Sequence, residues 1–167
     1  MIVSDTSPIT NLAAIGQLEL LRTLYQTLRI PDGVRTELEA SAVTWPGQAD
    51  VIAATWLERR SITNYLLVTA LQRDLDLGEA ESIVLALELK AELILMDEKE
   101  GRHAAQRLGL RPLGVIGILI EAKGKNIITE IRPHLDALRQ QAGFYISQKL
   151  YNYVLVQTNE TSKESYE

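Results

Sequence analysis

The sequence predicts an α/β fold in which a central parallel sheet is covered by helices on both faces. Two observations lead to this prediction. Apolar segments of three or four residues alternate along the chain with longer segments of helical periodicity. The 167 residues are 46% hydrophobic, which suits one compact domain with at most a short appendage. Strands that alternate with helices over a whole chain are typical of a parallel sheet.

Two strands and three helices are expected in the first forty residues. Thr6, Ser7 and Pro8 combine a hydroxyl cap with a proline in the first turn, which indicates a helix start. Gly16 ends this helix. The expected elements are a strand at 2–4, a helix over 9–15 with its start signal before it, a helix over 18–25, a strand at 28–30 and a helix around 34–38.

The middle of the chain holds both the weakest and the strongest patterns. Pro46 and Gly47 make residues 41–48 the most loop-like stretch, and 56–63 is ambiguous, with an edge strand at 61–63 as one interpretation. The remaining expected elements are helices over 49–56, 66–71 and 79–90, and a fully buried strand at 93–96.

The last third of the chain is expected to be mostly helical. Its polar end, residues 158–167, is expected to fray. The expected elements are a helix around 104–108, a strand at 112–115, and helices over 116–123, 130–141 and 147–157.

Composition excludes several classes of function. The chain has no cysteine, so disulfides, thiolate metal sites and cysteine nucleophiles are absent. No apolar run approaches the roughly 18–20 residues that span a bilayer, and the N-terminus lacks a secretory signal, so a cytoplasmic protein without a membrane anchor is expected. The net charge of -5 argues against sequence-blind DNA coating but not against a nuclease, whose site is itself acidic.

Four carboxylates fall where a parallel sheet would bring them together. Asp5 and Asp97 each follow a predicted strand, and sites in open α/β sheets form outside the carboxyl ends of the strands. Glu79 starts a helix directly after a glycine, and Glu37 lies in the first two turns of the helix that follows the second strand.

Such a group would be unstable without a counter-charge. At about 4 Å and an effective dielectric near 20, each like-charged pair costs roughly 4 kcal/mol, so the acids must protonate, separate or bind a cation. Hard oxygen ligands select Mg²⁺ or Mn²⁺, and such an ion can activate water and neutralise charge on a phosphodiester. The hypothesis is therefore metal-dependent phosphodiester hydrolysis.

Each acid also has an ordinary structural interpretation. Asp5 could form a turn and Asp97 could be a helix N-cap. Glu79 and Glu81 both favour the helix dipole, and spacing alone does not separate them. Glu37 could be a solvated helix residue.

Three segments of the sequence resemble the PIN-domain nucleases, the group that includes VapC-type toxins. They are IVSDTSPITNLA, VRTELEA and LGEAESIVLALELKAELILMDEKEGR, and the resemblance spans about residues 1–145. It implies a three-layer α/β/α sandwich with a parallel sheet and an acidic Mg²⁺ or Mn²⁺ site. Residues 146–167 are then expected to be a C-terminal helical extension and tail.

The resemblance assigns the acids one by one. The family's first Asp falls on Asp5, its helix Glu on Glu37 and its strand-end Asp on Asp97. Its third acid, usually Asp, falls by register on Glu79 rather than Glu81. The side chain of Glu is one methylene longer than that of Asp, and this difference leaves the number of bound ions open. Further positions implied are acids at Glu98 and Glu100, and small hydroxyls beside the first Asp at Thr6 and Ser7.

The activity implied is that of a ribonuclease. Asp5 and Asp97 would ligate the ion directly, and Glu37 and Glu79 would do so directly or through water. His103 and His134 are not needed. A locally basic run follows Asp97, and its expected RNA contacts are Lys99, Arg102 and Arg107.

The expected partners are RNA, a small antitoxin that covers the acidic site, and a second copy of the chain. The helices expected over 18–25 and 49–56 are rich in apolar residues and are expected to leave an apolar patch for such contacts. Two other functions compete with this one. A non-catalytic binding module would keep the fold but bind no cation. A phosphatase with an Asp nucleophile would need a second Asp two residues after Asp5, where Ser7 stands.

Overall fold

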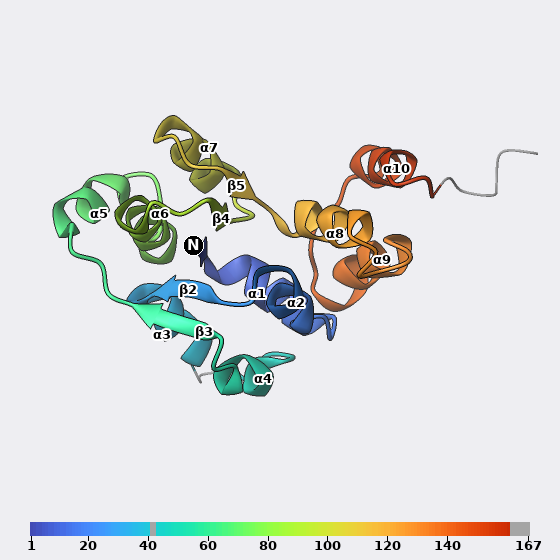
Figure 1. Ribbon diagram of the computed structural model, residues 1–167, viewed down its shortest axis with the longest axis horizontal. Coiled ribbons are helices and arrows are strands. Elements are labelled where there is room, and N and C mark those ends of the chain that lie inside the picture. The colour runs from blue at the N-terminus through green and yellow to red at the C-terminus, as the bar shows by residue number, and fades with distance from the viewer. Residues whose placement is uncertain (41–42, 161–167) are drawn as a thin grey trace, which may run out of the picture. The chain divides into compact units, whose positions relative to one another are not determined.

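The computed structural model describes residues 1–40 and 43–160 (Figure 1). Its sheet is built from five strands in the order β3-β2-β1-β4-β5, and every neighbouring pair is parallel. The strands are β1 (Ile2–Ser4), β2 (Leu28–Pro31), β3 (Leu57–Arg60), β4 (Leu93–Leu95) and β5 (Pro112–Leu113). Helices flank this sheet, which confirms the predicted α/β/α arrangement.

The helices follow the predicted alternation closely. In the first part of the chain they are α1 (Thr6–Ala14), α2 (Glu19–Tyr25), α3 (Asp32–Glu39), α4 (Gln48–Ala53), α5 (Tyr65–Leu71), α6 (Leu77–Leu89) and α7 (Lys99–Arg107). They are followed by α8 (Val115–Gly124), α9 (Arg132–Gln141) and α10 (Gln148–Gln157). Within the described residues, no helix is long and apolar enough to cross a membrane.

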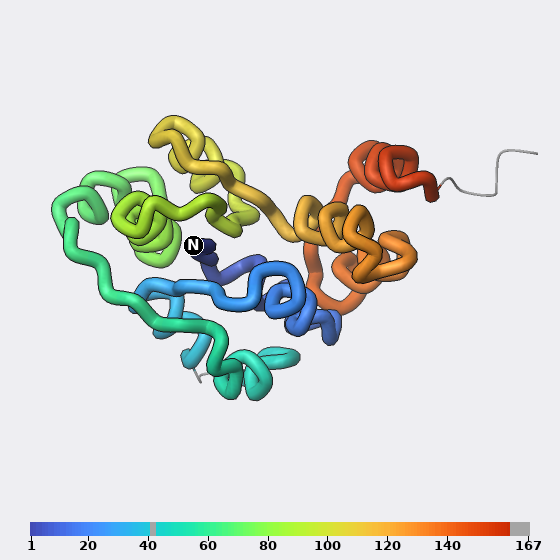
Figure 2. Tube along the Cα trace, viewed as in Figure 1, coloured from blue at the N-terminus to red at the C-terminus, as the bar shows by residue number. Residues whose placement is uncertain are grey.

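The centre of the sheet is formed by strands that are far apart in sequence. β1 pairs with β4 through Ile2↔Leu93 and Ser4↔Leu95, so the N-terminal segment lies beside a strand from the middle of the chain (Figure 2). The side chains of Val3, Ile94 and Leu95 are fully buried. This register brings the ends of β1 and β4 to the same edge of the sheet.

Helix α6 packs against β1, β2 and β4, and it is the most deeply buried helix of this core. Every residue from Gly78 to Ala86 is buried. A helix that is covered on all sides must be apolar around most of its circumference, so its two buried acids, Glu79 and Glu81, need specific partners.

The structure corrects three predicted elements. The helix predicted over 49–56 ends at Ala53, because the chain straightens there to enter the sheet. The edge strand is Leu57–Arg60 and not 61–63; only Leu57 of its four residues is buried, so it has no alternating pattern to detect. The strand predicted at 112–115 has only two residues, because the Val115 N–H turns to the side chain of Asp97.

The loop predicted over 41–48 is described only in part. Residues 43–47 belong to no helix or strand, and α4 begins at Gln48. Residues 41 and 42 lie outside the described part of the chain, as do residues 161–167 of the polar end that was expected to fray.

The chain divides into two compact units, Met1–Val115 and a second that begins at Ile116. In the second unit, the carboxylate of Glu160 accepts hydrogen bonds from Lys123 Nζ (2.5 Å) and the backbone N–H groups of Ile131 (2.8 Å) and Arg132 (3.2 Å). These bonds join the end of the described chain to the start of α9. The domain boundary expected near residue 145 stays a prediction.

Candidate functional site

Asp5 and Asp97 leave the sheet at the same edge. Ser4 is in register with Leu95, and the Asp5 N–H donates to the Leu95 carbonyl oxygen (2.9 Å). Asp97 follows two residues after the end of β4. The two aspartates therefore come from adjacent strands at their carboxyl ends, where open α/β sheets place their sites.

Neither aspartate acts as an ordinary helix cap. Asp5 occupies the N-cap position of α1, yet its side chain makes no capping hydrogen bond. The N-cap of α7 is Glu98 and not Asp97. The interpretation of Asp97 as the N-cap of the following helix is therefore wrong, and the Asp5 side chain is not used to cap α1.

The carboxyl groups of Asp5 and Glu37 converge on Gly78, at the start of α6. A methyl group added to Gly78 would collide with Glu37 Oε1 and would lie 3.4 Å from Asp5 Oδ1. Glu37 Oε1 occupies the space that a side chain at position 78 would fill, so the glycine leaves room for this carboxyl group beside Asp5. Three elements, β1, α3 and α6, thus meet in one acidic group.

Burial and mutual repulsion disfavour the charged forms of these acids. Burial raises the pKa of Asp5 to about 8, and the negative charges of Asp76, Glu37 and Glu79 add to the rise. Partial desolvation and the charge of Asp76 also raise the pKa of Glu37. The buried Thr6 hydroxyl, which has no hydrogen-bond partner of ordinary geometry, lies near Glu37 and opposes this rise.

Glu79 is held at the start of α6 by a reciprocal pair of hydrogen bonds with Asp76. The Glu79 N–H donates to Asp76 Oδ1 (2.8 Å), and the Asp76 N–H donates to Glu79 Oε2 (3.0 Å). Burial raises the pKa of Glu79, and so do the charges of Asp76, Glu98 and Glu37. Asp76 was missed in the sequence, although an Asp three residues before a Glu is the known signal of this capping box.

Glu81 has a different partner from Glu79. Its Oε2 accepts a hydrogen bond from the Gly33 N–H (2.6 Å), so Glu81 ties α6 to the first turn of α3. The two glutamates, which spacing alone did not separate, therefore have distinct environments: Glu79 lies among the other acids and Glu81 at a helix N-terminus.

Both oxygens of Asp97 accept hydrogen bonds. Oδ1 accepts from the Val115 N–H (2.7 Å), and Oδ2 accepts from Asn11 Nδ2 (3.2 Å). Burial raises the pKa of Asp97, while these two bonds and the positive charge of Arg102 oppose the rise. Asn11 was missed in the sequence, because an amide in a helix has no pattern that points to a partner 86 residues away.

The expected RNA-contacting residues lie on two helices of this unit. Thr6 and Ser7 form the start of α1, and Lys99, Arg102 and Arg107 are exposed on α7. The further acids Glu98 and Glu100 lie at the start of α7 and are exposed. His103 is exposed on the same helix, and the His134 ring of the second unit contacts the Glu130 carbonyl oxygen.

The donor chemistry of the acidic group suits a hard divalent cation. Among the described residues, no lysine or arginine is hydrogen-bonded to Asp5, Glu37 or Glu79, and the raised pKa of Asp5 means that its charged form is disfavoured unless a positive charge lies nearby. Among the described residues, no three His, Asp or Glu side chains lie close enough together to hold a metal ion. The acids converge in pairs, as Asp5 and Glu37 do at Gly78.

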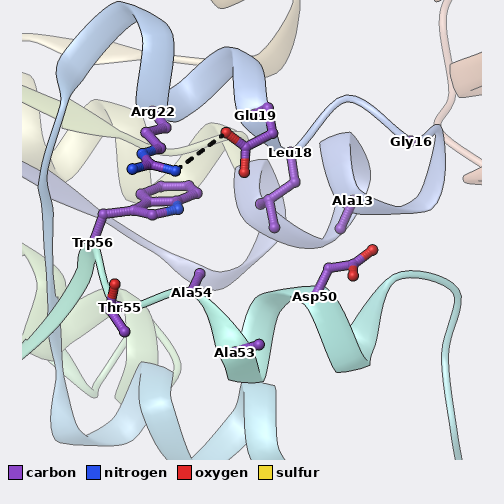
Figure 3. Close-up of a pocket in the computed structure, with 10 residues that line it drawn as sticks. All are labelled: Ala13, Gly16, Leu18, Glu19, Arg22, Asp50, Ala53, Ala54, Thr55 and Trp56. Carbon is purple, nitrogen blue, oxygen red and sulfur yellow. Dashed lines mark ion pairs between the residues drawn. The ribbon is translucent and has the colours of Figure 1, made fainter.

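A separate pocket of about 430 Å³ lies where β3 begins, away from the carboxyl ends of the strands (Figure 3). It is lined by residues of α1, α2 and α4 and by Trp56, which directly precedes β3. Arg22 and Glu19 form an ion pair of 3.9 Å on its wall. It contains none of the predicted catalytic residues, which lie where the strands end and not where they begin.

Comparison with protein families gives a match over nearly the whole chain. The family model DUF3368, described as a PIN domain, matches residues 1–160. No curated protein matches the chain.

Proposed function

Because the chain belongs to the PIN-domain family, whose members are generally nucleases, we propose that it is an Mg²⁺- or Mn²⁺-dependent ribonuclease. One observation supports this proposal more than any other: Asp5 and Glu37 converge at Gly78 while the pKa of Asp5 rises to about 8. Asp5 is buried, and its negative charge beside Glu37 is costly to the fold, a cost that a bound cation would offset.

The residues proposed to hold the ion are Asp5 and Asp97 directly, with Glu37 and Glu79 binding directly or through water. When bound, the ion supplies a water nucleophile at neutral pH and stabilises the negative charge that develops on the phosphate. The hydrogen bonds of Glu79 to Asp76 and of Asp97 to Val115 hold two of these carboxylates in fixed orientations.

The chain's own residues would bind and orient the RNA backbone. Thr6 and Ser7, at the start of α1 beside Asp5, are the proposed contacts of the RNA phosphate oxygens on this helix. Arg102 is exposed and lies close to Asp97, so its guanidinium can contact a phosphate that approaches the acids. Lys99 and Arg107 on the same helix would contact further phosphates along the RNA strand.

The resemblance to VapC-type toxins extends the proposal to partners. We propose a small antitoxin that covers the acidic site, and a homodimer. Apolar side chains that stay exposed in the described unit support a protein contact: Leu66 is 86% exposed and Tyr65 is 61% exposed, both on α5.

A non-catalytic binding module is the second candidate. It is favoured by the observation that no three acids of the described residues converge as a metal site. The two candidates differ in one measurable property, since only the nuclease requires a divalent ion at the acids.

The test compares wild type, Asp5→Asn and Asp50→Asn in cleavage of single-stranded and structured RNA with Mg²⁺, Mn²⁺ or EDTA. Asp50 is an exposed acid on α4, so the control carries the same chemical change outside the acidic group. We expect metal-dependent cleavage that only Asp5→Asn abolishes. Equal cleavage by all three proteins would show a contaminating nuclease, and the absence of any Mn²⁺ binding heat would favour the binding module.

A further inference from the structure

Asn11 joins the two strand-end aspartates through one short helix. Helix α1 starts directly after Asp5 and carries Asn11 to the side chain of Asp97. The amide nitrogen of Asn11 donates to Asp97 Oδ2 at 3.2 Å. Because a helix is rigid over so few residues, α1 fixes the position of Asp97 relative to Asp5.

The helix itself does not require an asparagine at this position. Asparagine is one of the poorer helix formers, and it favours caps and turns over helix interiors. The core face of α1 is supplied by Pro8, Ile9, Leu12 and Ala13, while Asn11 is only partly buried. A residue that disfavours its own helix and adds little to the core needs another reason, and its bond to Asp97 supplies one.

The carboxyl group of Asp97 is restrained on three sides. Val115 N–H binds Oδ1 at 2.7 Å, and Asn11 binds Oδ2 at 3.2 Å. Gly114 packs against the same group, since a methyl group there would lie 2.9 Å from Oδ1. With both oxygens bound by donors from different elements, the carboxyl plane has one orientation.

The donors from Asn11 and Val115 are neutral, which matters for what Asp97 can bind. A lysine or arginine at position 11 would hold the carboxylate equally well but would neutralise it. An amide orients the carboxylate and leaves its negative charge available to a cation. This is the arrangement in which residues outside the ligand set hold a metal ligand in place.

We propose that Asn11 is a positioning residue that orients Asp97 for divalent-cation binding. This inference rests on the proposed function, because it requires Asp97 to be a ligand. Asn11 touches neither ion nor RNA in this scheme and acts only through Asp97.

The test uses the full chain and five proteins: wild type, Asn11→Leu, Asn11→Gln, Asp97→Asn and the control Thr10→Ala. Leucine has the branched shape and the number of side-chain heavy atoms of asparagine and favours the helix, so Asn11→Leu should fold while it loses the donor. Glutamine keeps the amide. Thr10 lies next to Asn11 on α1, and its hydroxyl donates to the Ser7 carbonyl oxygen of the same helix (3.2 Å).

The readouts are Mn²⁺ affinity by calorimetry with the metal alone, thermal unfolding in EDTA, and kcat and KM for RNA cleavage. We expect Asn11→Leu to weaken Mn²⁺ binding about 10- to 100-fold, the usual effect of losing a group that orients a ligand. Its unfolding temperature in EDTA should not fall, Asn11→Gln should recover part of the affinity, and Thr10→Ala should bind as wild type does.

Three outcomes would overturn the inference in different ways. If Asp97→Asn loses Mn²⁺ binding but Asn11→Leu keeps it, Asn11 has only a structural role and the proposed function stands. If Asp97→Asn also binds Mn²⁺ normally, Asp97 is no ligand, and the proposed site fails with the inference. If Asn11→Leu is unstable in EDTA, the Mn²⁺ affinities of Asn11→Gln and Thr10→Ala are compared instead. An equal loss of Mn²⁺ affinity in these two variants would refute the role of the amide.

Discussion

The substitution Gly78→Ala should separate catalysis from stability. Gly78 is the second residue of α6, and a methyl group there would collide with Glu37 Oε1 and would lie 3.4 Å from Asp5 Oδ1. The carboxyl end of Glu37 is flexible and can move away. Alanine also favours a helix over glycine by up to about 1 kcal/mol, so the free energy of unfolding should change by no more than about 1 kcal/mol.

The effect on cleavage should be much larger. Binding and catalytic groups must be held within about 0.5 Å of their working positions, and a shift near 1 Å can lower a rate about 100-fold. Glu37 cannot keep its position beside Asp5 once the methyl group is present. We therefore expect kcat/KM for RNA cleavage to fall about 100-fold in Gly78→Ala, measured with Mn²⁺ on a labelled single strand.

Gly33→Ala is the matched control, because Gly33 is the second residue of α3 and also faces a glutamate. Its added methyl group would lie 2.8 Å from Glu81 Oε2 and would disturb the bond from the Gly33 N–H. That bond to a charged group contributes about 1.5–3 kcal/mol, so Gly33→Ala should lower stability and leave cleavage intact. The reasoning is refuted if Gly78→Ala cleaves as wild type does, or if the two variants lose activity equally.

Three further predictions concern single acids. Since burial raises the pKa of Asp5 to about 8, the metal-free protein should lose stability as pH rises from about 4 to 8, and Asp5→Asn should remove that loss in thermal unfolding. The pKa of Glu160 is lowered by Lys123 and neighbouring N–H groups. Its contribution to the free energy of unfolding is therefore full above the pKa that Glu160 has in the unfolded chain, and it is lost in more acidic solution. Urea unfolding of Glu160→Gln should therefore show a loss of about 1.5–3 kcal/mol at pH 7 and a smaller one near pH 3; an equal loss at both would contradict this. Glu88→Ala removes the acceptor of the Thr63 N–H (2.8 Å) and should cost about 1 kcal/mol with no change in cleavage.

Buried strands were predictable from the sequence, and the edge strand β3 was not. A central parallel strand such as β4 is apolar throughout, so a short apolar run identifies it. Strand β3 has one buried residue, Leu57, followed by three exposed charged ones, and its position depends on pairing with β2. Pairing between distant segments leaves no local signal.

The candidate site was predictable where a carboxylate follows a strand. Asp5 and Asp97 were identified in this way, and the register of β1 and β4 brings their ends together. Asp76 and Asn11 were missed for a different reason: each acts through a partner, and Asp76 also serves as an ordinary N-cap. The binding of a divalent ion by these acids stays a prediction.

The charged residues of β3 affect how two copies of this protein can associate. Unpaired backbone groups at the rim of a sheet can recruit strands from other molecules, which leads to aggregation. Here Glu58, Arg59 and Arg60 project from that rim, and the opposite rim is a strand of two residues that begins with Pro112. Charged side chains on one rim and a proline on the other disfavour strand pairing between the sheets of neighbouring molecules.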